Sequence, residues 1–128
     1  MNRYLMPVVL LILVVFSTQT GNANEISAIK KAAMNYMNSW YQGDAIKMEE
    51  SLHSNLAKRS LKSINDKIQL RQTTAADMIN WTQMGYGKTL WSEKHKIEVI
   101  VLDYFKNIAS VKVLTPDYHE YLHLIKIN

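Results

Sequence analysis

Apolar residues recur with a helical period between residues 25 and 42. They fall on one stripe of a 3.6-residue repeat and predict an amphipathic helix over this segment. Asn24 is its predicted N-cap, and Gly43 is the predicted glycine just past its end. Aromatic side chains end the stripe, so the last two turns are expected to face the core. The stripe consists of Ile26, Ile29, Ala33, Tyr36, Met37 and Trp40.

Two shorter helices are predicted to follow. Asp44 is suited to cap a helix that runs to about Leu52, and residues 73–77 form a capping-box-like start with Asp in place of the usual Glu. The helix that opens there is expected to end near Met84, before the glycines of residues 85–87. The side chains expected to face inward are Ile46, Met48 and Leu52 in the first helix, and Met78, Ile79 and either Trp81 or Thr82 in the second.

The last third of the chain has the pattern of an antiparallel sheet. Three largely apolar runs, residues 94–103, 108–115 and 120–128, are separated by short polar breaks, as in hairpin-linked strands. The segment before them is irregular, and around residues 59–64 a short strand and a brief helix both fit. Helices that precede an antiparallel sheet predict an α+β domain.

The N-terminus follows the pattern of a secretory signal peptide. Arg3 supplies a positive charge, residues 5–16 are uncharged and apolar, and small residues precede a cleavage site after Ala23. A retained membrane anchor is the alternative, but this run is short for a bilayer core about 30 Å thick. We therefore expect a signal peptide over 1–23 and a mature domain over 24–128. The domain is expected to be periplasmic or secreted, with no stable membrane insertion after cleavage.

Composition narrows the choice of partners. Without Arg3, 14 Lys and Arg stand against 11 Asp and Glu, a net charge of +3, and the basic residues are scattered. A nucleic-acid-binding protein is expected to gather them in a denser stripe with aromatic residues between, so no nucleic-acid partner is predicted. The chain has no cysteine, which excludes disulfides and thiolate metal sites.

Four short segments carry a family resemblance: residues 40–44 read WYQGD, 52–59 LHSNLAKR, 107–113 NIASVKV and 117–124 DYHEYLHL. In this order they resemble the W-x-x-G-D, L-H-P-D-L-x-K-R, N-I-A-S-V-K-V and D-Y-L-H-L segments of the putative lumazine-binding family. That family belongs to the nuclear-transport-factor-2-like superfamily. The resemblance implies a cone-shaped α+β domain, in which a curved antiparallel sheet wraps the long N-terminal helix and encloses a pocket. It also implies a homodimer formed through the sheet.

The chain departs from the family pattern in two places. Residues 54–55 are Ser-Asn where the pattern has Pro-Asp. Members of the family also continue past the D-Y-L-H-L strand, through a Gly-x-Trp turn, into a last strand that this sequence does not show. We therefore expect residues 120–128 to form an exposed sheet edge, either because the chain is truncated or because a partner subunit covers the edge.

The expected function is the binding of a small hydrophobic or aromatic molecule, or an accessory role, with no cofactor. Tyr36, Trp40, Trp81 and Trp91 are candidates to line the pocket by stacking on a flat ring, although aromatic residues at helical spacing are also typical of a core. Arg59 is the candidate to hold an anionic group of the ligand.

A small lyase or isomerase is the alternative, because the superfamily includes such enzymes. A carboxylate in an apolar pocket has a raised pKa, which suits a base, and Asp103 or His53 is the candidate proton-transfer group. Asp103 also has the simpler interpretation of a turn residue. The sequence shows no convergent acid–base pair, so an enzyme is the less favoured interpretation. His119 and His123 share a face but lie about 13 Å apart on a strand, so no metal site is predicted.

Overall fold

The computed structural model describes residues 20–127, so residues 1–19 of the expected signal peptide over 1–23 lie outside the described part. Helices alternate with two groups of strands, and the predicted α+β class is confirmed. The helices are α1 (Thr20–Gln42), α2 (Ala45–Ser51), α3 (Ala75–Gln83) and the short 3₁₀ helix η1 (Lys88–Leu90). The strands are β1 (Lys58–Ile64), β2 (Lys67–Thr73), β3 (Glu98–Phe105), β4 (Ile108–Leu114) and β5 (His119–Ile125).

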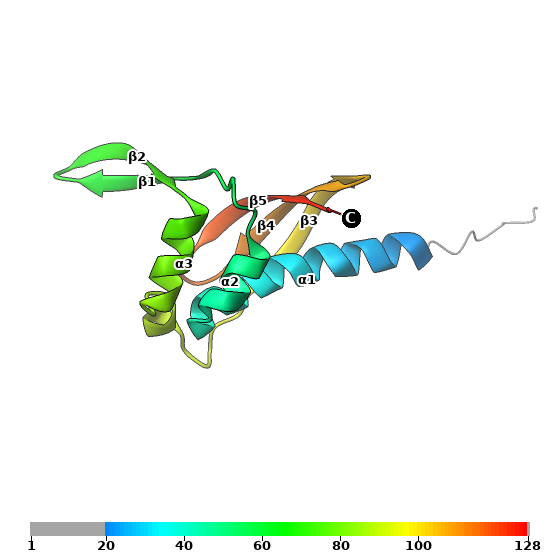
Figure 1. Cartoon of the computed structure of the whole chain (residues 1–128), viewed down its shortest axis with the longest axis horizontal. Helices are drawn as coiled ribbons and strands as arrows, with labels where there is room; N and C mark the ends of the chain where they lie inside the picture. The colour runs from blue at the N-terminus through cyan, green and yellow to red at the C-terminus, as the bar shows by residue number, and fades with distance from the viewer. Residues whose placement is uncertain (1–19, 128) are drawn as a thin grey trace, which may run out of the picture.

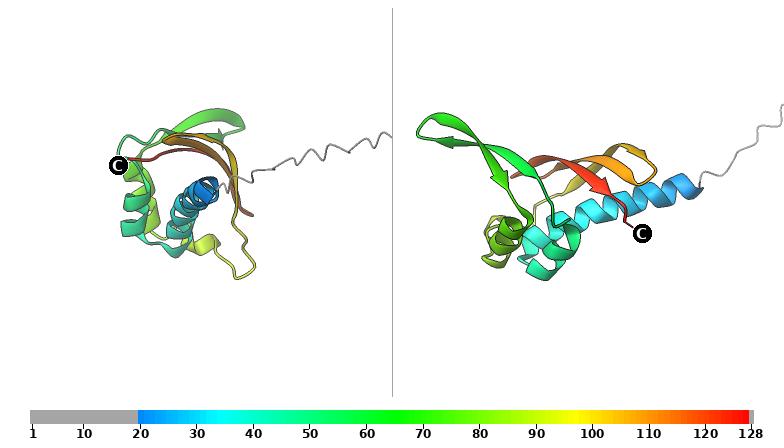
Figure 2. Two further views of the ribbon diagram at one scale, coloured as in Figure 1. Left: turned by 90° about the vertical axis from the view of Figure 1, so that its right-hand side faces the viewer. Right: turned by 45° about the horizontal axis from the view of Figure 1, so that its top comes forward.

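A curved antiparallel sheet of order β3-β4-β5 arches over the long helix α1 (Figures 1 and 2). Strands β1 and β2 form a separate two-stranded sheet. Helices α2 and α3 lie beside the C-terminal end of α1 (Figure 1). In the described part of the chain the sheet does not close into a barrel, and the arrangement is consistent with the cone-like fold that was predicted.

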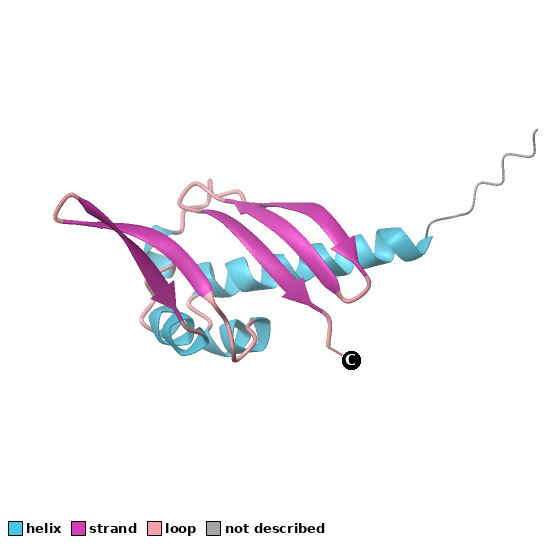
Figure 3. Ribbon diagram, turned by 90° about the horizontal axis from the view of Figure 1, so that it is seen from above, coloured by secondary structure: helices cyan, strands magenta, loops and turns pink. Residues whose placement is uncertain are grey.

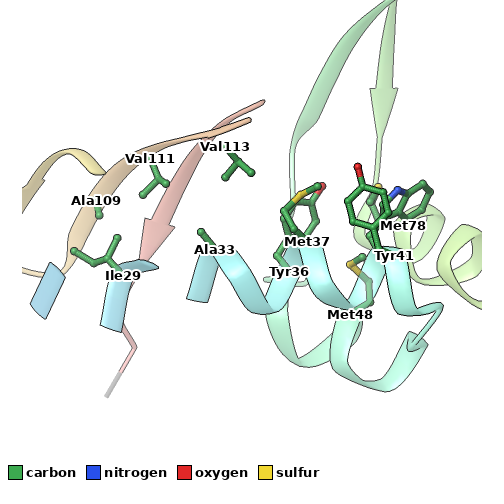
Figure 4. Close-up of a cluster of buried hydrophobic side chains, with 11 residues drawn as sticks. Ile29, Ala33, Tyr36, Met37, Tyr41, Met48, Met78, Ala109, Val111 and Val113 are labelled. Carbon is green, nitrogen blue, oxygen red and sulfur yellow. The ribbon is translucent and has the colours of Figure 1, made fainter. Parts of the chain in front are cut away.

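The core lies between α1 and the central strand β4. Alternate residues of β4 are buried, and two of them, Val111 and Val113, have no exposed surface. Figure 4 shows these side chains opposite Ile29 and Ala33 of α1, as the predicted stripe requires. The stripe is confirmed from Ile29 onward, since its remaining members are buried. The cluster is completed by Met48 from α2 and Met78 from α3.

The predicted end of α1 is confirmed by its hydrogen bonds. Gly43 has φ +68°, and its N–H donates to the carbonyl of Trp40 at 3.2 Å. The N–H of Asp44 donates to the carbonyl of Ser39 at 3.0 Å, which completes a Schellman motif. The Asp44 carboxylate then accepts from the N–H of Lys47 and caps α2. One short segment therefore ends the first helix and starts the next.

The predicted capping box of α3 is also present, at Thr74 and Asp77. Three other expectations were wrong. Helix α1 begins at Thr20, so Asn24 lies inside the helix and does not cap it. Ile46 is 72% exposed, because it lies in the first turn of α2 on the side away from the core. The first long strand begins at Glu98 rather than at residue 94, because residues 92–95 form a turn.

The irregular segment before α3 is a β-hairpin. The strand alternative for residues 59–64 is confirmed, but the returning strand β2 was not predicted. Asn65 and Asp66 form the two-residue turn with φ of 49° and 61°, a conformation that these residue types tolerate. The hairpin extends away from the helices (Figure 3), and only Lys58 and Thr73 at its base are not exposed. Because neither face is buried, its sequence lacks a clear alternation.

Candidate functional site

A group of aromatic side chains gathers where the last turns of α1 meet the start of β5. We call Tyr36, Trp40, Tyr41 and Tyr118 the aromatic cluster. The rings of Trp40 and Tyr118 meet edge to face with centroids 6.3 Å apart, and those of Tyr41 and Tyr118 lie 6.4 Å apart. Helical spacing brings the three α1 residues to the side that faces the sheet. The cluster therefore contains two of the predicted ligand-binding residues, Tyr36 and Trp40.

Three polar groups form a network at the rim of this cluster. The Tyr36 hydroxyl donates to Glu120 Oε2 at 3.0 Å and accepts from Lys58 Nζ at 2.9 Å, while Lys58 Nζ lies 2.6 Å from Glu120 Oε1. The network joins α1, β1 and β5. Burial raises the pKa of Tyr36 well above its usual value, and the negative charge of Glu120 adds to this effect. The Lys58 and Glu120 side chains stay 24% and 15% exposed, so the rim still reaches solvent.

Trp40 contributes a buried donor that no described group satisfies. Trp40 is 9% exposed, and its Nε1 makes no hydrogen bond of good geometry among the described residues. The Tyr118 side chain nevertheless lies close enough for the indole to oppose the rise that burial causes in the pKa of Tyr118. Gly87 allows the chain to approach this indole closely, because a Cβ there would lie 2.6 Å from Trp40 Nε1. Buried donors are nearly always paired, and an unpaired one costs about 1–3 kcal/mol. The indole N–H is thus a buried donor without an acceptor of good geometry among the described residues.

Tyr41 lies at the far side of the cluster in a second polar group. Its hydroxyl donates to Asp117 Oδ2 at 2.8 Å and lies 2.9 Å from the Thr115 hydroxyl. Burial is the main cause that raises the pKa of Tyr41 to about 12. His95 Nε2 is 3.0 Å from the same Asp117 oxygen, and Trp91 stacks on the His95 ring with centroids 5.4 Å apart. This group fastens the loop before β3 to the turn before β5.

The other predicted ligand-binding residues lie outside the cluster or at its margin. Trp91 contacts Tyr41, with ring centroids 5.3 Å apart, but Trp91 is itself 45% exposed. Trp81 lies on α3 beneath the guanidinium of Arg71, whose Cζ is 4.2 Å from the centroid of the Trp81 ring. Arg59 is exposed on β1 of the hairpin. The structure thus brings Tyr36 and Trp40 together, while Trp81 packs at the margin of the core and Arg59 lies exposed on the hairpin.

The two candidate proton-transfer residues lie outside the aromatic cluster. His53 is exposed in the loop after α2, where its Nδ1 accepts from the N–H of Asn55 at 3.1 Å. Asp103 is exposed at an irregularity of β3, where the register against β4 shifts, and it accepts from the N–H of Tyr104 at 2.8 Å. It is therefore a strand residue rather than a turn residue. Neither side chain contacts another acid or base within the described residues.

Two of the hollows on the described surface are open, and the aromatic cluster lines neither of them. One, of about 620 Å³, is where α1, α2 and α3 meet, around Gly43, Ile46 and Ile79. The other, of about 450 Å³, runs between the start of α1 and β3 and includes Asp103 and Lys30 among its lining residues. Both are shallow and mixed in polarity. Neither hollow is lined by a group of aromatic side chains.

Several residues of the cluster and of the polar network at its rim were missed by the sequence interpretation. Lys58, Tyr118 and Glu120 were not singled out, nor was Tyr41, although it follows Trp40 directly. Glu120 carried a usable signal. It occupies the same face of β5 as the apolar Leu122 and Leu124, and a lone acid in such a register needs a partner. The partner, Lys58, is 62 residues away, so the pairing depends on the fold.

His119 and His123 share one face of β5, as predicted, and no group of three metal-ligating side chains occurs within residues 20–127. None of the described helices combines the length and the apolar character that a membrane crossing requires.

Comparison with known proteins gives a family match. A family model described as putative lumazine-binding matches residues 24–128, and the nuclear-transport-factor-2-like placement is consistent with it. No curated protein and no solved structure matches the chain.

Proposed function

The chain belongs to the putative lumazine-binding family, and we propose that it binds a small, flat aromatic molecule at the aromatic cluster. The observation that carries this proposal is the buried indole N–H of Trp40, which forms no hydrogen bond of good geometry within the described residues, although the Tyr118 side chain lies close to it. A carbonyl oxygen or ring nitrogen of the ligand would accept a hydrogen bond from this N–H. The ring of the ligand would pack edge to face or stacked against the Tyr118 ring.

The polar rim supports the same ligand chemistry. Lys58 and Glu120 place a donor and an acceptor side by side at the partly exposed edge of the cluster. A flat heterocycle with N–H and carbonyl groups on its edge matches that pair. Movement of the Lys58 side chain, which requires breaking its hydrogen bonds to Tyr36 and Glu120, would open the cluster to a ligand. Lumazine, a bicyclic ring with such groups, is therefore a suitable first probe.

Native mass spectrometry of the purified protein tests this proposal. We expect a ligand-bound species when lumazine is added, and weaker binding by the Trp40→Phe variant, which keeps an aromatic ring but lacks the N–H donor. Trp91→Phe is the matched control, because Trp91 is partly exposed outside the rim, and it should bind as the unmodified chain does. Equal binding by all three proteins, or none by any, would contradict a site at Trp40.

We also propose that the protein is a homodimer formed through the outer face of its sheet. Phe105, Ile108 and Ile125 lie opposite one another on β3, β4 and β5, and they are 65%, 58% and 67% exposed. Monomers rarely expose apolar patches of this kind, and burial against a second copy removes the patch from water.

Export is the remaining part of the proposal. Residues 1–23 carry the charge and apolar pattern of a signal peptide, and the family match begins at residue 24, next to the expected cleavage site after Ala23. N-terminal sequencing of the protein recovered from outside the cytoplasm would give Asn24 as the first residue. A retained Met1 would contradict cleavage.

We do not extend the proposal to an enzymatic reaction. Asp103 and His53 are both exposed, and each is engaged by a neighbouring backbone N–H. No observation in the described residues favours the lyase or isomerase alternative over binding.

A further inference from the structure

The outer edge of β5 carries backbone groups that no described strand pairs with. β5 pairs with β4 in continuous register, and just beyond it the N–H of Lys126 donates to the carbonyl of Asn107 at 2.8 Å. In an antiparallel ladder, successive residues direct their N–H and C=O groups to opposite sides. The even-numbered residues of β5 therefore bond to β4. The N–H and C=O groups of Tyr121, His123 and Ile125 point to the unpaired edge.

This edge lacks the features by which natural sheets prevent strand addition. The other edge strand, β3, has a register irregularity between Val101 and Asp103, and such irregularities disrupt pairing with a further strand. β5 contains no proline, no lysine and no such irregularity. Its one charged residue, Glu120, is engaged by Lys58. The β5 edge is thus regular and uncharged along the rest of its length.

A second unpaired strand edge lies beside it. β1 pairs only with β2 among the described strands, and Lys58 at its start reaches Glu120 of β5 without any backbone pairing between the two strands. Figure 3 shows the hairpin and the three-stranded sheet side by side above the helices. A strand that joined β5 would therefore lie next to β1, and it would cover the half-buried Leu122 and Leu124.

The charge around this edge selects the kind of strand. The hairpin over 58–73 has a net charge of +4, which becomes +3 when Glu120, the partner of Lys58, is included. An added strand with acidic side chains complements that charge. A second copy of the chain would bring its own basic hairpin, so like charges oppose pairing between two β5 edges. The charged residues of the hairpin are Lys58, Arg59, Lys62, Lys67, Arg71 and, with opposite sign, Asp66.

We infer that the β5 edge binds an extended, acidic segment of a partner protein as an added strand. Backbone hydrogen bonds to Tyr121, His123 and Ile125 supply the pairing, and alternate apolar side chains of the segment cover the inner face, as in other cases of strand addition. This surface is distinct from the outer face of the sheet. It does not depend on the proposed ligand, because the pairing involves backbone groups of β5 alone.

Amide hydrogen exchange of the purified protein tests the inference. The probe is a synthetic peptide, blocked at both ends, that alternates valine with glutamate over the length of β5. When the protein is saturated with peptide, the amide hydrogens of Tyr121 and His123 should exchange at about one tenth of their rate in the free protein, or more slowly still. Those of Leu122 and Leu124 should change little, because they already bond to β4. A peptide of the same sequence with alternate backbone nitrogens methylated is the control, and it should give no protection.

A variant of the protein gives a second check. Tyr121→Pro removes one edge N–H that points away from β4, so the native ladder keeps its bonds, and this variant should lose the peptide-induced protection. Tyr121→Thr keeps the N–H and should retain it. The inference is overturned if the unmethylated peptide gives no protection, or if the methylated peptide protects equally. Protection of the same amides without peptide, with a doubled mass, would assign the edge to a second copy and would also overturn it.

Discussion

Tyr41 shows how a single buried hydroxyl can make stability depend on pH. Burial is the main cause that raises its pKa to about 12, whereas an unfolded tyrosine titrates near 10. Between these values the unfolded chain releases a proton that the folded chain retains. The contribution of Tyr41 to the free energy of unfolding should therefore be constant below about pH 10 and fall as the pH rises toward 12.

Chemical denaturation at pH 8 and pH 11 measures this fall. Tyr41→Phe should reduce it but not abolish it, because burial also raises the pKa values of Tyr36 and Tyr118. Tyr86→Phe is the control, because that side chain is 53% exposed, and it should leave the fall unchanged. If Tyr41→Phe lost as much stability between the two pH values as the unmodified protein, the assigned role of Tyr41 would be wrong.

Gly87 is a position where a single methyl group should be costly. Its Cβ would lie 2.4 Å from the carbonyl oxygen of Trp40 and 2.6 Å from two atoms of the indole ring. The glycine has φ −68°, so the conflict is steric and not a matter of backbone conformation. Gly87→Ala should lower the free energy of unfolding by about 1–3 kcal/mol. Met84→Ala, at a side chain 65% exposed nearby, should change it little, and an equal effect of both would refute close packing at Gly87.

At the scale of the elements, the Tyr36–Lys58–Glu120 network ties the hairpin to the sheet and to α1. Glu120→Gln removes the charge but keeps the shape, and should cost about 1–3 kcal/mol of stability. Lys58→Met should cost less once Glu120 is already Gln, because the two side chains act on each other. Denaturant unfolding of both single variants and the double variant gives the coupling. Additive effects would show that the 2.6 Å contact contributes nothing to stability.

Elements with one buried face were predictable from the sequence, and elements without one were not. The stripe of α1 and the alternation of β4 each have a buried side, so their period appears directly in the residues. Glycine and capping residues marked the ends of α1 and the starts of α2 and α3 for local reasons. Strand β2 escaped because its apolar Ile68 and Leu70 are 73% and 67% exposed, and only its turn residues, Asn65 and Asp66, gave a signal.

The candidate site was predictable only in its helical part. Tyr36 and Trp40 share a face of one helix, so their spacing sufficed to group them. Lys58, Tyr118 and Glu120 come from other segments and meet them through long-range packing. No local sequence pattern indicates that these residues are in contact, because Lys58 and Glu120 are 62 residues apart in the chain.

At the scale of the whole molecule, the outer sheet face is the proposed dimer interface. Phe105→Asp places a charge in the patch formed with Ile108 and Ile125, so it should shift the protein from dimer to monomer in sedimentation velocity. Ile46→Asp is the control, because Ile46 is 72% exposed on α2, and it should leave the dimer intact. A dimer that survives Phe105→Asp would place the interface elsewhere.

We propose above all that a ligand accepts a hydrogen bond from the buried indole N–H of Trp40. Nuclear magnetic resonance reads this group directly, because each of the 3 tryptophans gives one indole N–H signal that a Trp→Phe variant can assign. On titration with lumazine, the Trp40 signal should shift and exchange more slowly with solvent, while the Trp81 signal stays in place. A titration that shifts the Trp81 or Trp91 signal and leaves that of Trp40 unchanged would contradict the account.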